Sequence, residues 1–151
     1  MVEEGAPAPD FELASDEGET VTLSALRGKP VVLYFYPKDD TPGCTTEACE
    51  FRDAYERFRE QGVEILGVSP DTEASHQKFK SKYELPFTLL ADPDHHAAEA
   101  YGVWKEKKNY GKTYMGVERS TFVIDADGKV ARAMRGIRPA GHAAQVLETL
   151  G

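Results

Sequence analysis

The sequence is poor in cysteine, in basic residues and in long apolar runs, and each shortage argues against a class of protein. There are two cysteines among 151 residues, so thiols alone cannot complete a four-ligand zinc site. Lys and Arg number 18 against 26 Asp and Glu, a net charge of -8 that argues against nucleic-acid binding and against docking on an anionic membrane. No apolar stretch approaches the roughly 18 residues of a membrane-spanning helix.

The first ten residues are acidic and lack an apolar stretch, so we expect no secretory signal and a cytoplasmic protein. A reducing compartment disfavours permanent disulfides, which makes redox chemistry the natural role for the two cysteines. The length matches one domain, and we expect residues 1–151 to form a single domain that folds without a disulfide or a metal.

The hydrophobic pattern predicts an α/β domain whose central mixed sheet is flanked by helices. An N-terminal hairpin is expected from strands 11–13 and 20–23, and a closing hairpin from strands 120–125 and 129–134. The other expected strands are 30–36, 63–69 and 87–90, and the expected helices are 42–61, 72–83, 92–101 and 139–150. Residues 103–118 are polar and aromatic, which predicts a long loop.

The most informative stretch, residues 37–49, lies between a buried strand and the first long helix. Thr41 followed by Pro42 is typical of a helix start, with threonine as the N-cap and proline at the first helical position. Cys44 then falls inside the first turn, close to unpaired backbone N–H groups and the positive end of the helix dipole. Both features favour a thiolate over a thiol.

The helical period places the two cysteines on different sides of this helix. Cys44 heads an apolar stripe that continues through Ala48, Phe51, Tyr55 and Phe58. Cys49 lies roughly 140° around the helix, and the two Cα atoms are roughly 8.6 Å apart while the helix is intact. A disulfide needs a Cα separation below about 7 Å. The two cysteines can therefore bond only if the first turn unwinds.

A buried cysteine is most often a small apolar side chain, and Thr-Pro is most often a plain helix cap. That interpretation does not explain a proline four residues before the threonine, a cysteine within the first turn and a second cysteine facing another way. The pattern Pro37-x-x-x-Thr41-x-x-Cys44 resembles the active-site signature of the peroxiredoxins. Cys44-x4-Cys49 is similar to the peroxiredoxin Q, or bacterioferritin comigratory protein, subfamily. The resemblance continues in segments 102–104, 110–116 and 118–122.

The resemblance implies a thioredoxin-like fold and a thiol-dependent peroxidase that reduces hydrogen peroxide and organic hydroperoxides. Cys44 would attack the peroxide and become a sulfenic acid, which Cys49 would resolve as an intramolecular disulfide. A thioredoxin or a similar dithiol reductant would then restore both thiols. Thr41 would bind the peroxide, Pro37 would shield the pocket, and Arg119 would hold the thiolate and polarise the peroxide.

No cofactor and no metal are expected, and the chain is expected to act as a monomer or a weakly associating dimer. Two other functions remain open on the sequence alone. A protein dithiol–disulfide oxidoreductase would use the same fold, although its usual signature is C-x-x-C, in which the helix need not melt. A non-enzymatic binding or holdase module would leave both cysteines inert, and thiol titration separates it from the enzymes.

Three weaker signals have a plain structural interpretation beside a functional one. Glu47 either orients the arginine through a salt link or is a first-turn carboxylate favoured by the helix dipole. Asp39 and Asp40 are expected to be a solvated loop pair rather than a metal site. His95 and His96 would point about 100° apart on a helix, so we expect no metal there.

Overall fold

Five consecutive buried residues, Val31–Phe35, form strand β3 in the interior of a seven-stranded sheet. The structure is a computed structural model that describes residues 2–150. β3 pairs in parallel with β4 (Glu64–Ser69) and antiparallel with β8 (Ser120–Ile124). The predicted mixed sheet is thus confirmed, and its central strand is buried on both faces, as the unbroken apolar run indicated.

The remaining strands extend the sheet on both sides in the order β2-β1-β5-β4-β3-β8-β9. β5 (Thr88–Ala91) lies parallel to β4, and β9 (Val130–Arg135) closes the other edge antiparallel to β8. The predicted N-terminal hairpin is present as β1 (Glu12–Ser15) and β2 (Thr20–Thr22). The hairpin joins the sheet through antiparallel pairing of β1 with β5, a position that the local pattern does not predict.

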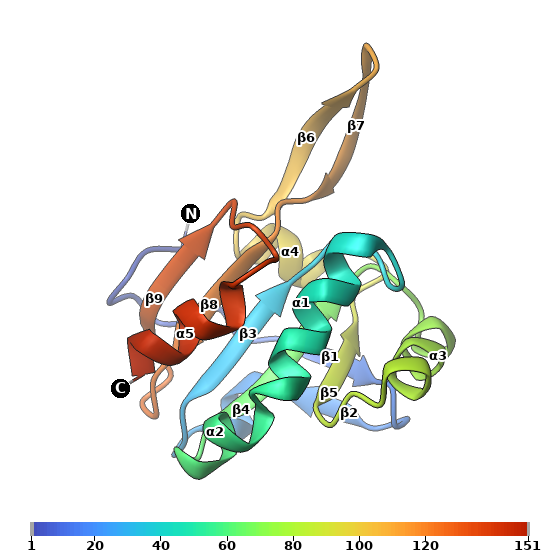
Figure 1. Cartoon of the computed structure of the whole chain (residues 1–151). Helices are drawn as coiled ribbons and strands as arrows, with labels where there is room; N and C mark the ends of the chain where they lie inside the picture. The colour runs from blue at the N-terminus through green and yellow to red at the C-terminus, as the bar shows by residue number, and fades with distance from the viewer. Residues whose placement is uncertain (1, 151) are drawn as a thin grey trace.

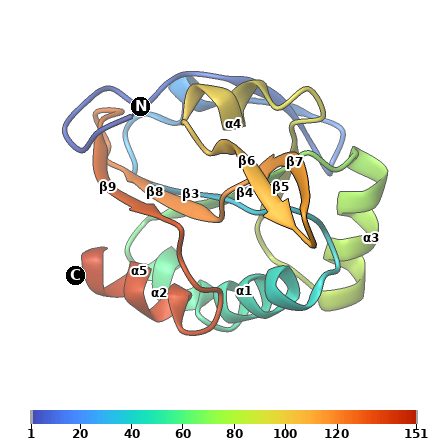
Figure 2. The ribbon, with the colours of Figure 1, turned by 90° about the horizontal axis from the view of Figure 1, so that it is seen from above.

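Helices cover both faces of the sheet (Figures 1 and 2). One face carries α1 (Pro42–Asp53), α2 (Tyr55–Glu60), α3 (Glu73–Tyr83) and α5 (His142–Leu150). The opposite face carries the short α4 (His96–Ala100) and the 3-10 helix η1 (Leu23–Leu26). Each face of the sheet packs against one apolar core. Alternate residues of β3 point into these two cores, Tyr34 on the α1 side and Leu33 on the α4 side. Among residues 2–150, no helix has the length and apolar composition needed to cross a bilayer.

The single helix predicted over 42–61 is wrong, because the chain turns at Ala54 (φ −94°, ψ 0°) and divides into α1 and α2. The apolar stripe continues across the turn, since Phe51 and Phe58 are both fully buried. A straight helix of 20 residues is about 30 Å long, whereas the five residues of β3 span only about 17 Å. The turn keeps both phenylalanines over the sheet, and Gly62 then ends α2 with a φ of 71°.

The loop predicted over 103–118 is also wrong, because these residues form a hairpin of β6 (Trp104–Asn109) and β7 (Lys112–Val117). Figure 1 shows the hairpin projecting away from the rest of the molecule. Tyr110 and Gly111 both have positive φ values, 51° and 76°, which fits the two-residue turn that suits a twisted hairpin. Most of its side chains face solvent, so the apolar alternation that normally identifies strands is missing.

Candidate active site

The site is built where β3 ends and α1 begins. Thr41 has the extended backbone of an N-cap residue, Pro42 is the first helical residue, and Cys44 lies in the first turn. The side chain of Cys44 points inward, with 1% of its surface exposed, and belongs to the same apolar cluster as Ala48 and Phe51. The inward orientation predicted from the helical period is therefore present.

Arg119 reaches this cysteine from the two-residue connection between β7 and β8. Its Nη2 donates a hydrogen bond to Cys44 Sγ at 3.3 Å, and its Nη1 donates to Glu47 Oε1 at 2.6 Å. The arginine side chain is only 14% exposed, so solvent screens these contacts weakly. Gly43 makes room for it, because a Cβ there would lie 3.1 Å from Arg119 Nη2. Arg119 thus comes from a distant part of the sequence and contacts both Cys44 and Glu47 of α1.

The charges at this site are shaped by burial. Burial raises the pKa of Glu47 to about 7, although the guanidinium of Arg119 opposes the shift. Burial works against the charge of Arg119, but Glu47 and Cys44 together raise the pKa of this guanidinium above its ordinary value. Glu47 Oε2 has no hydrogen-bond partner among residues 2–150. A fixed cation therefore sits beside the sulfur, and such a cation stabilises a sulfur anion.

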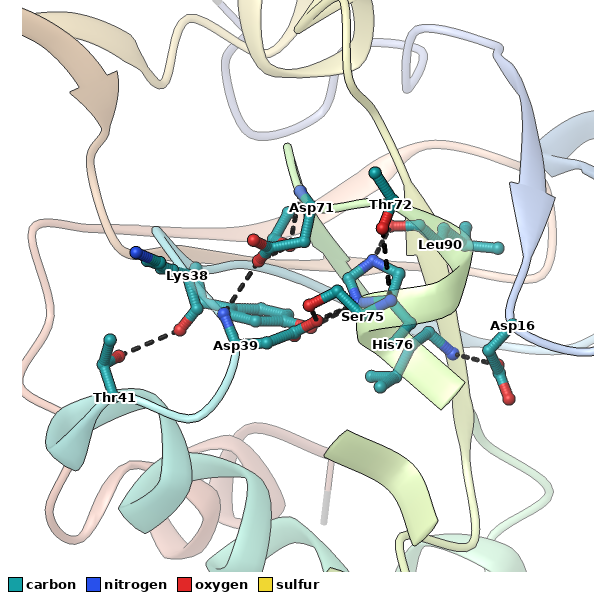
Figure 3. A network of polar contacts seen from close by, with 12 residues as sticks. Asp16, Lys38, Asp39, Thr41, Asp71, Thr72, Ser75, His76 and Leu90 are labelled. Carbon is teal, nitrogen blue, oxygen red and sulfur yellow. Dashed lines mark hydrogen bonds and ion pairs between the residues drawn. The ribbon is translucent and has the colours of Figure 1, made fainter. Parts of the chain in front are cut away.

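Thr41 differs from the prediction in one respect. Its backbone occupies the N-cap position, but its hydroxyl makes no capping hydrogen bond with the helix. Instead Thr41 Oγ1 donates to the carbonyl oxygen of Lys38 at 2.9 Å, as Figure 3 shows. The hydroxyl proton is thereby engaged, and the oxygen retains lone pairs that can accept a hydrogen bond from a ligand. Pro37 lies half-buried just after β3, in the same loop.

Cys49 lies on a different side of α1 from Cys44, and its side chain is half-buried. Both cysteines are free thiols, and α1 runs without a break from Pro42 to Asp53 through both of them. Because the helix is intact, its geometry keeps the two Cα atoms roughly 8.6 Å apart. The structure therefore presents the wound helix, in which a disulfide between Cys44 and Cys49 cannot form.

The expectation that Asp39 is a solvated loop residue is wrong, whereas Asp40 is exposed as expected. Asp39 is 7% exposed and accepts a hydrogen bond from the hydroxyl of Tyr36 at 2.6 Å. Its other oxygen lies 2.7 Å from Nδ1 of His76, a residue that the sequence analysis did not single out. One signal was available, because a tyrosine buried at the end of a central strand needs a polar partner nearby.

Asp39, Asp71 and His76 also form a group whose potential ligand atoms all lie within 4.8 Å of one another. Those atoms are already engaged within the protein. Asp71 Oδ2 accepts from the backbone N–H of Asp39 and from the hydroxyl of Ser69, both at 2.7 Å. Oxygen atoms that face N–H and O–H donors cannot turn toward a cation without breaking those bonds, so we interpret the group as a hydrogen-bonded network.

The sequence matches the model of the AhpC/TSA family over residues 5–133. It is 57% identical over 149 residues to peroxiredoxin Bcp of Bacillus subtilis strain 168, covering 99% of this chain and 95% of that protein. It is 44% identical over 146 residues to peroxiredoxin Bcp of Escherichia coli K12, covering 97% of this chain and 94% of that protein.

Solved structures agree with the sequence matches. The bacterioferritin comigratory protein of Xanthomonas campestris superimposes with a TM-score of 0.92 at 41% identity, covering 98% of this chain and 97% of that chain. A cysteine-to-serine mutant of PrxQ from Xylella fastidiosa superimposes with a TM-score of 0.94 at 36% identity, covering 99% and 96%. The predicted thioredoxin-like fold is confirmed by these likenesses. The chain therefore belongs to the AhpC/TSA family and is a thiol-dependent peroxidase of the Bcp/PrxQ peroxiredoxins.

Proposed function

We propose that this peroxidase reduces hydrogen peroxide and organic hydroperoxides, with Cys44 as the attacking sulfur and Cys49 as the thiol that completes the cycle. The observation that carries the proposal is the contact of 3.3 Å between Cys44 Sγ and Arg119 Nη2 at the start of α1. A related protein supports the substrate class, since alkyl peroxide reduction has been studied in the bacterioferritin comigratory protein of Xanthomonas campestris.

In the first step the Cys44 thiolate attacks one oxygen of the hydroperoxide and the O–O bond breaks. The sulfur becomes a sulfenic acid, and the other oxygen leaves as water or an alcohol after taking a proton. Arg119 lies beside the sulfur and can donate to the oxygens whose charge changes during cleavage. The hydroxyl proton of Thr41 is bonded to the carbonyl oxygen of Lys38, so its oxygen can accept a hydrogen bond from the hydroperoxide O–H and orient the substrate. Pro37 would shield the pocket from water.

In the second step the Cys49 thiol condenses with the Cys44 sulfenic acid, which forms a disulfide and releases water. This step requires the first turns of α1 to unwind, because the wound helix keeps the Cα atoms too far apart. A dithiol reductant of the thioredoxin type then restores both thiols. Both cysteines belong to one chain, so a monomer can complete the cycle. The cycle depends on reducing power, and we therefore place the enzyme in the cytoplasm.

Peroxide turnover with thioredoxin, thioredoxin reductase and NADPH tests the proposal in three proteins. The wild type should turn over continuously, and Cys44→Ser should show no activity. Cys49→Ser should consume one equivalent of peroxide and then stall, unless small thiols rescue it. Turnover by Cys44→Ser would overturn the assignment of the attacking sulfur. Normal cycling by Cys49→Ser with thioredoxin would overturn only the role of Cys49.

A further inference from the structure

We propose that Asp39 and His76 are positioning residues that hold the N-terminal end of α1 wound and so set how fast Cys49 reaches oxidised Cys44. The inference rests on the proposed function, because it concerns the disulfide-forming step. It arises from a polar network between the loop before α1 and helix α3 (Figure 3).

The centre of this network is the contact between Asp39 Oδ2 and His76 Nδ1 at 2.7 Å. The side chain of His76 is fully buried and that of Asp39 is 4% exposed, so water does not compete for the contact. Asp39 Oδ2 also accepts from the hydroxyl of Ser75 at 2.8 Å, and Oδ1 accepts from Tyr36 at 2.6 Å. The carboxyl group thus links the end of β3 to two residues of α3.

The other ring nitrogen of His76 shows that the contact holds a proton. Nε2 lies 2.9 Å from the carbonyl oxygen of Leu90, which can only accept, so Nε2 carries a hydrogen. Nδ1 faces a carboxyl oxygen, so a second proton lies between Nδ1 and Asp39 Oδ2, whichever atom carries it. Hydrogen bonds of this kind, between groups that share or separate charge, are stronger than bonds between neutral groups.

Three further contacts fasten the same loop. The backbone N–H of Asp39 donates to Asp71 Oδ2 at 2.7 Å. The next residue, Asp40, has a left-handed backbone with a φ of 56°, and its carboxylate accepts from Lys82 and from Tyr83, both at 2.8 Å. The loop is therefore joined to α3 and to the residues just before it at two successive positions, immediately ahead of the N-cap of α1.

This placement gives the network a role in the reaction. Unwinding the first turns of α1 moves Thr41 and Pro42, which follow the fastened positions directly. A firm anchor favours the wound helix, in which Cys44 meets Arg119 and the peroxide. It opposes the unwound helix, in which Cys49 can approach. Weakening the anchor should therefore slow the attack on peroxide and speed disulfide formation, whereas a general loss of stability gives no reason for opposite changes.

Two substitutions at one position separate these possibilities. In His76→Asn the amide nitrogen lies near the position of Nδ1, so the variant keeps a donor for Asp39 and loses the bond to Leu90. In His76→Gln the amide lies near the position of Nε2, so the variant keeps the bond to Leu90 and loses the donor for Asp39. Each variant loses one buried hydrogen bond of His76, and the two variants differ in which partner is lost.

The experiment adds one equivalent of hydrogen peroxide to each reduced protein, quenches with acid at set times and resolves sulfenic acid from disulfide by intact mass. We expect His76→Gln to form the disulfide about tenfold faster and to react with peroxide about threefold more slowly, as loss of a charge-assisted bond implies. In His76→Asn the ratio of the two rates should stay within about twofold of the wild type. At excess peroxide, His76→Gln should also accumulate less sulfinic acid, because its sulfenic acid is shorter-lived.

Equal rate ratios in His76→Gln, His76→Asn and the wild type would overturn the inference and leave the proposed function intact. A wild type that reacts with peroxide but forms no Cys44–Cys49 disulfide would overturn both. If His76→Gln does not fold, Ser75→Ala removes one bond to Asp39 from the half-buried edge of the network. That variant should shift the two rates in the same directions by about threefold, and unchanged rates would overturn the inference.

Discussion

The two ends of α1 are held by different physical means. The N-terminal end depends on directed polar contacts, from Arg119 to Cys44 and Glu47 and from the preceding loop to α3. The C-terminal end depends on apolar packing around Phe51, which is fully buried and stacks on Tyr34 with ring centroids 4.9 Å apart. The contacts that surround the sulfur lie at the N-terminal end, so a change of charge on Cys44 acts on that end and not on the packing of Phe51.

This difference suits a helix that unwinds and rewinds in each turnover, as the proposed function requires. In the proposed cycle, oxidation would turn a Cys44 thiolate into a neutral sulfenic acid, and the Arg119 guanidinium would lose the anion beside it. Polar contacts weaken when a charge is lost, whereas apolar packing is insensitive to it. In that cycle we expect the C-terminal half to remain docked on the sheet, so that the N-terminal half can rewind against it.

The largest expected effect comes from breaking the apolar end. Phe51→Ala should lower the free energy of unfolding by about 3–5 kcal/mol, because it leaves a cavity among Tyr34, Phe58 and Phe87. Urea denaturation monitored by circular dichroism measures the change. Phe51→Leu is the control and should lose less, since it retains most of the apolar volume. A loss below about 1 kcal/mol in Phe51→Ala would mean that packing does not hold this end.

The next effect concerns the pH dependence of stability at the polar end. The pKa of Glu47 is about 7 in the folded chain and 4.5 as its ordinary value. Between these values the unfolded chain loses the proton while the folded chain keeps it, so stability falls as pH rises. The loss from this group is about 3 kcal/mol between pH 4.5 and 7.

Glu47→Gln has no carboxyl proton to lose, so it should lack this component of the pH dependence. The quantity to compare is the difference in free energy of unfolding between wild type and variant, measured by urea denaturation at each pH. Taking the difference removes the contribution of the other carboxyl groups. Parallel stability curves for the two proteins would show that Glu47 does not titrate with a raised pKa.

The third effect tests whether Arg119 does more than hold an anion. Arg119→Met should lower the second-order rate with peroxide by about 100-fold, since it removes a donor aimed at the breaking O–O bond. The fraction of thiolate, followed by ultraviolet absorbance, should fall by less, because ionisation alone is worth at most about 30-fold. Arg119→Lys keeps the charge without the planar fork and should lie between the two. Equal losses in rate and thiolate would contradict this role.

The smallest effect is expected at Thr41. Thr41→Val should lower kcat/KM for peroxide by about tenfold, which corresponds to one lost hydrogen bond. The free energy of unfolding should fall by only about 1 kcal/mol, because the substitution removes the exposed bond to the Lys38 carbonyl and no capping bond. Thr41→Ser retains the hydroxyl and should keep the wild-type rate. A Thr41→Val protein with an unchanged rate would remove Thr41 from the peroxide site.

The fold and the centre of the candidate site could be predicted from the sequence, because both depend on local patterns of residues. The buried strand β3 and the helix start at Thr41-Pro42 can each be recognised from a few consecutive residues. The helical period is enough to predict that the Cys44 side chain points inward. The β6–β7 hairpin was missed for the opposite reason. It projects from the body, and most of its side chains face solvent, so its strands lack the alternation that burial imposes.

The polar network was also missed, because its parts lie far apart in the sequence. Asp39 and His76 are separated by 37 positions and meet only once β3, β4 and α3 are assembled. Nothing local distinguishes a carboxylate that will be buried from one that stays in water, as the neighbour Asp40 shows. Aspartate is mostly exposed in folded proteins, so the burial of Asp39 beside His76 can be recognised only from the tertiary structure.

The spacing of the two thiols along α1 has one more consequence. Groups tethered by five residues of backbone meet at an effective concentration that the tether sets, independent of how much protein is dissolved. Disulfide closure should therefore be a first-order event whose half-time does not change on dilution from micromolar to nanomolar protein. An enzyme organised in this way retains its full capacity per molecule even where only a few copies are present.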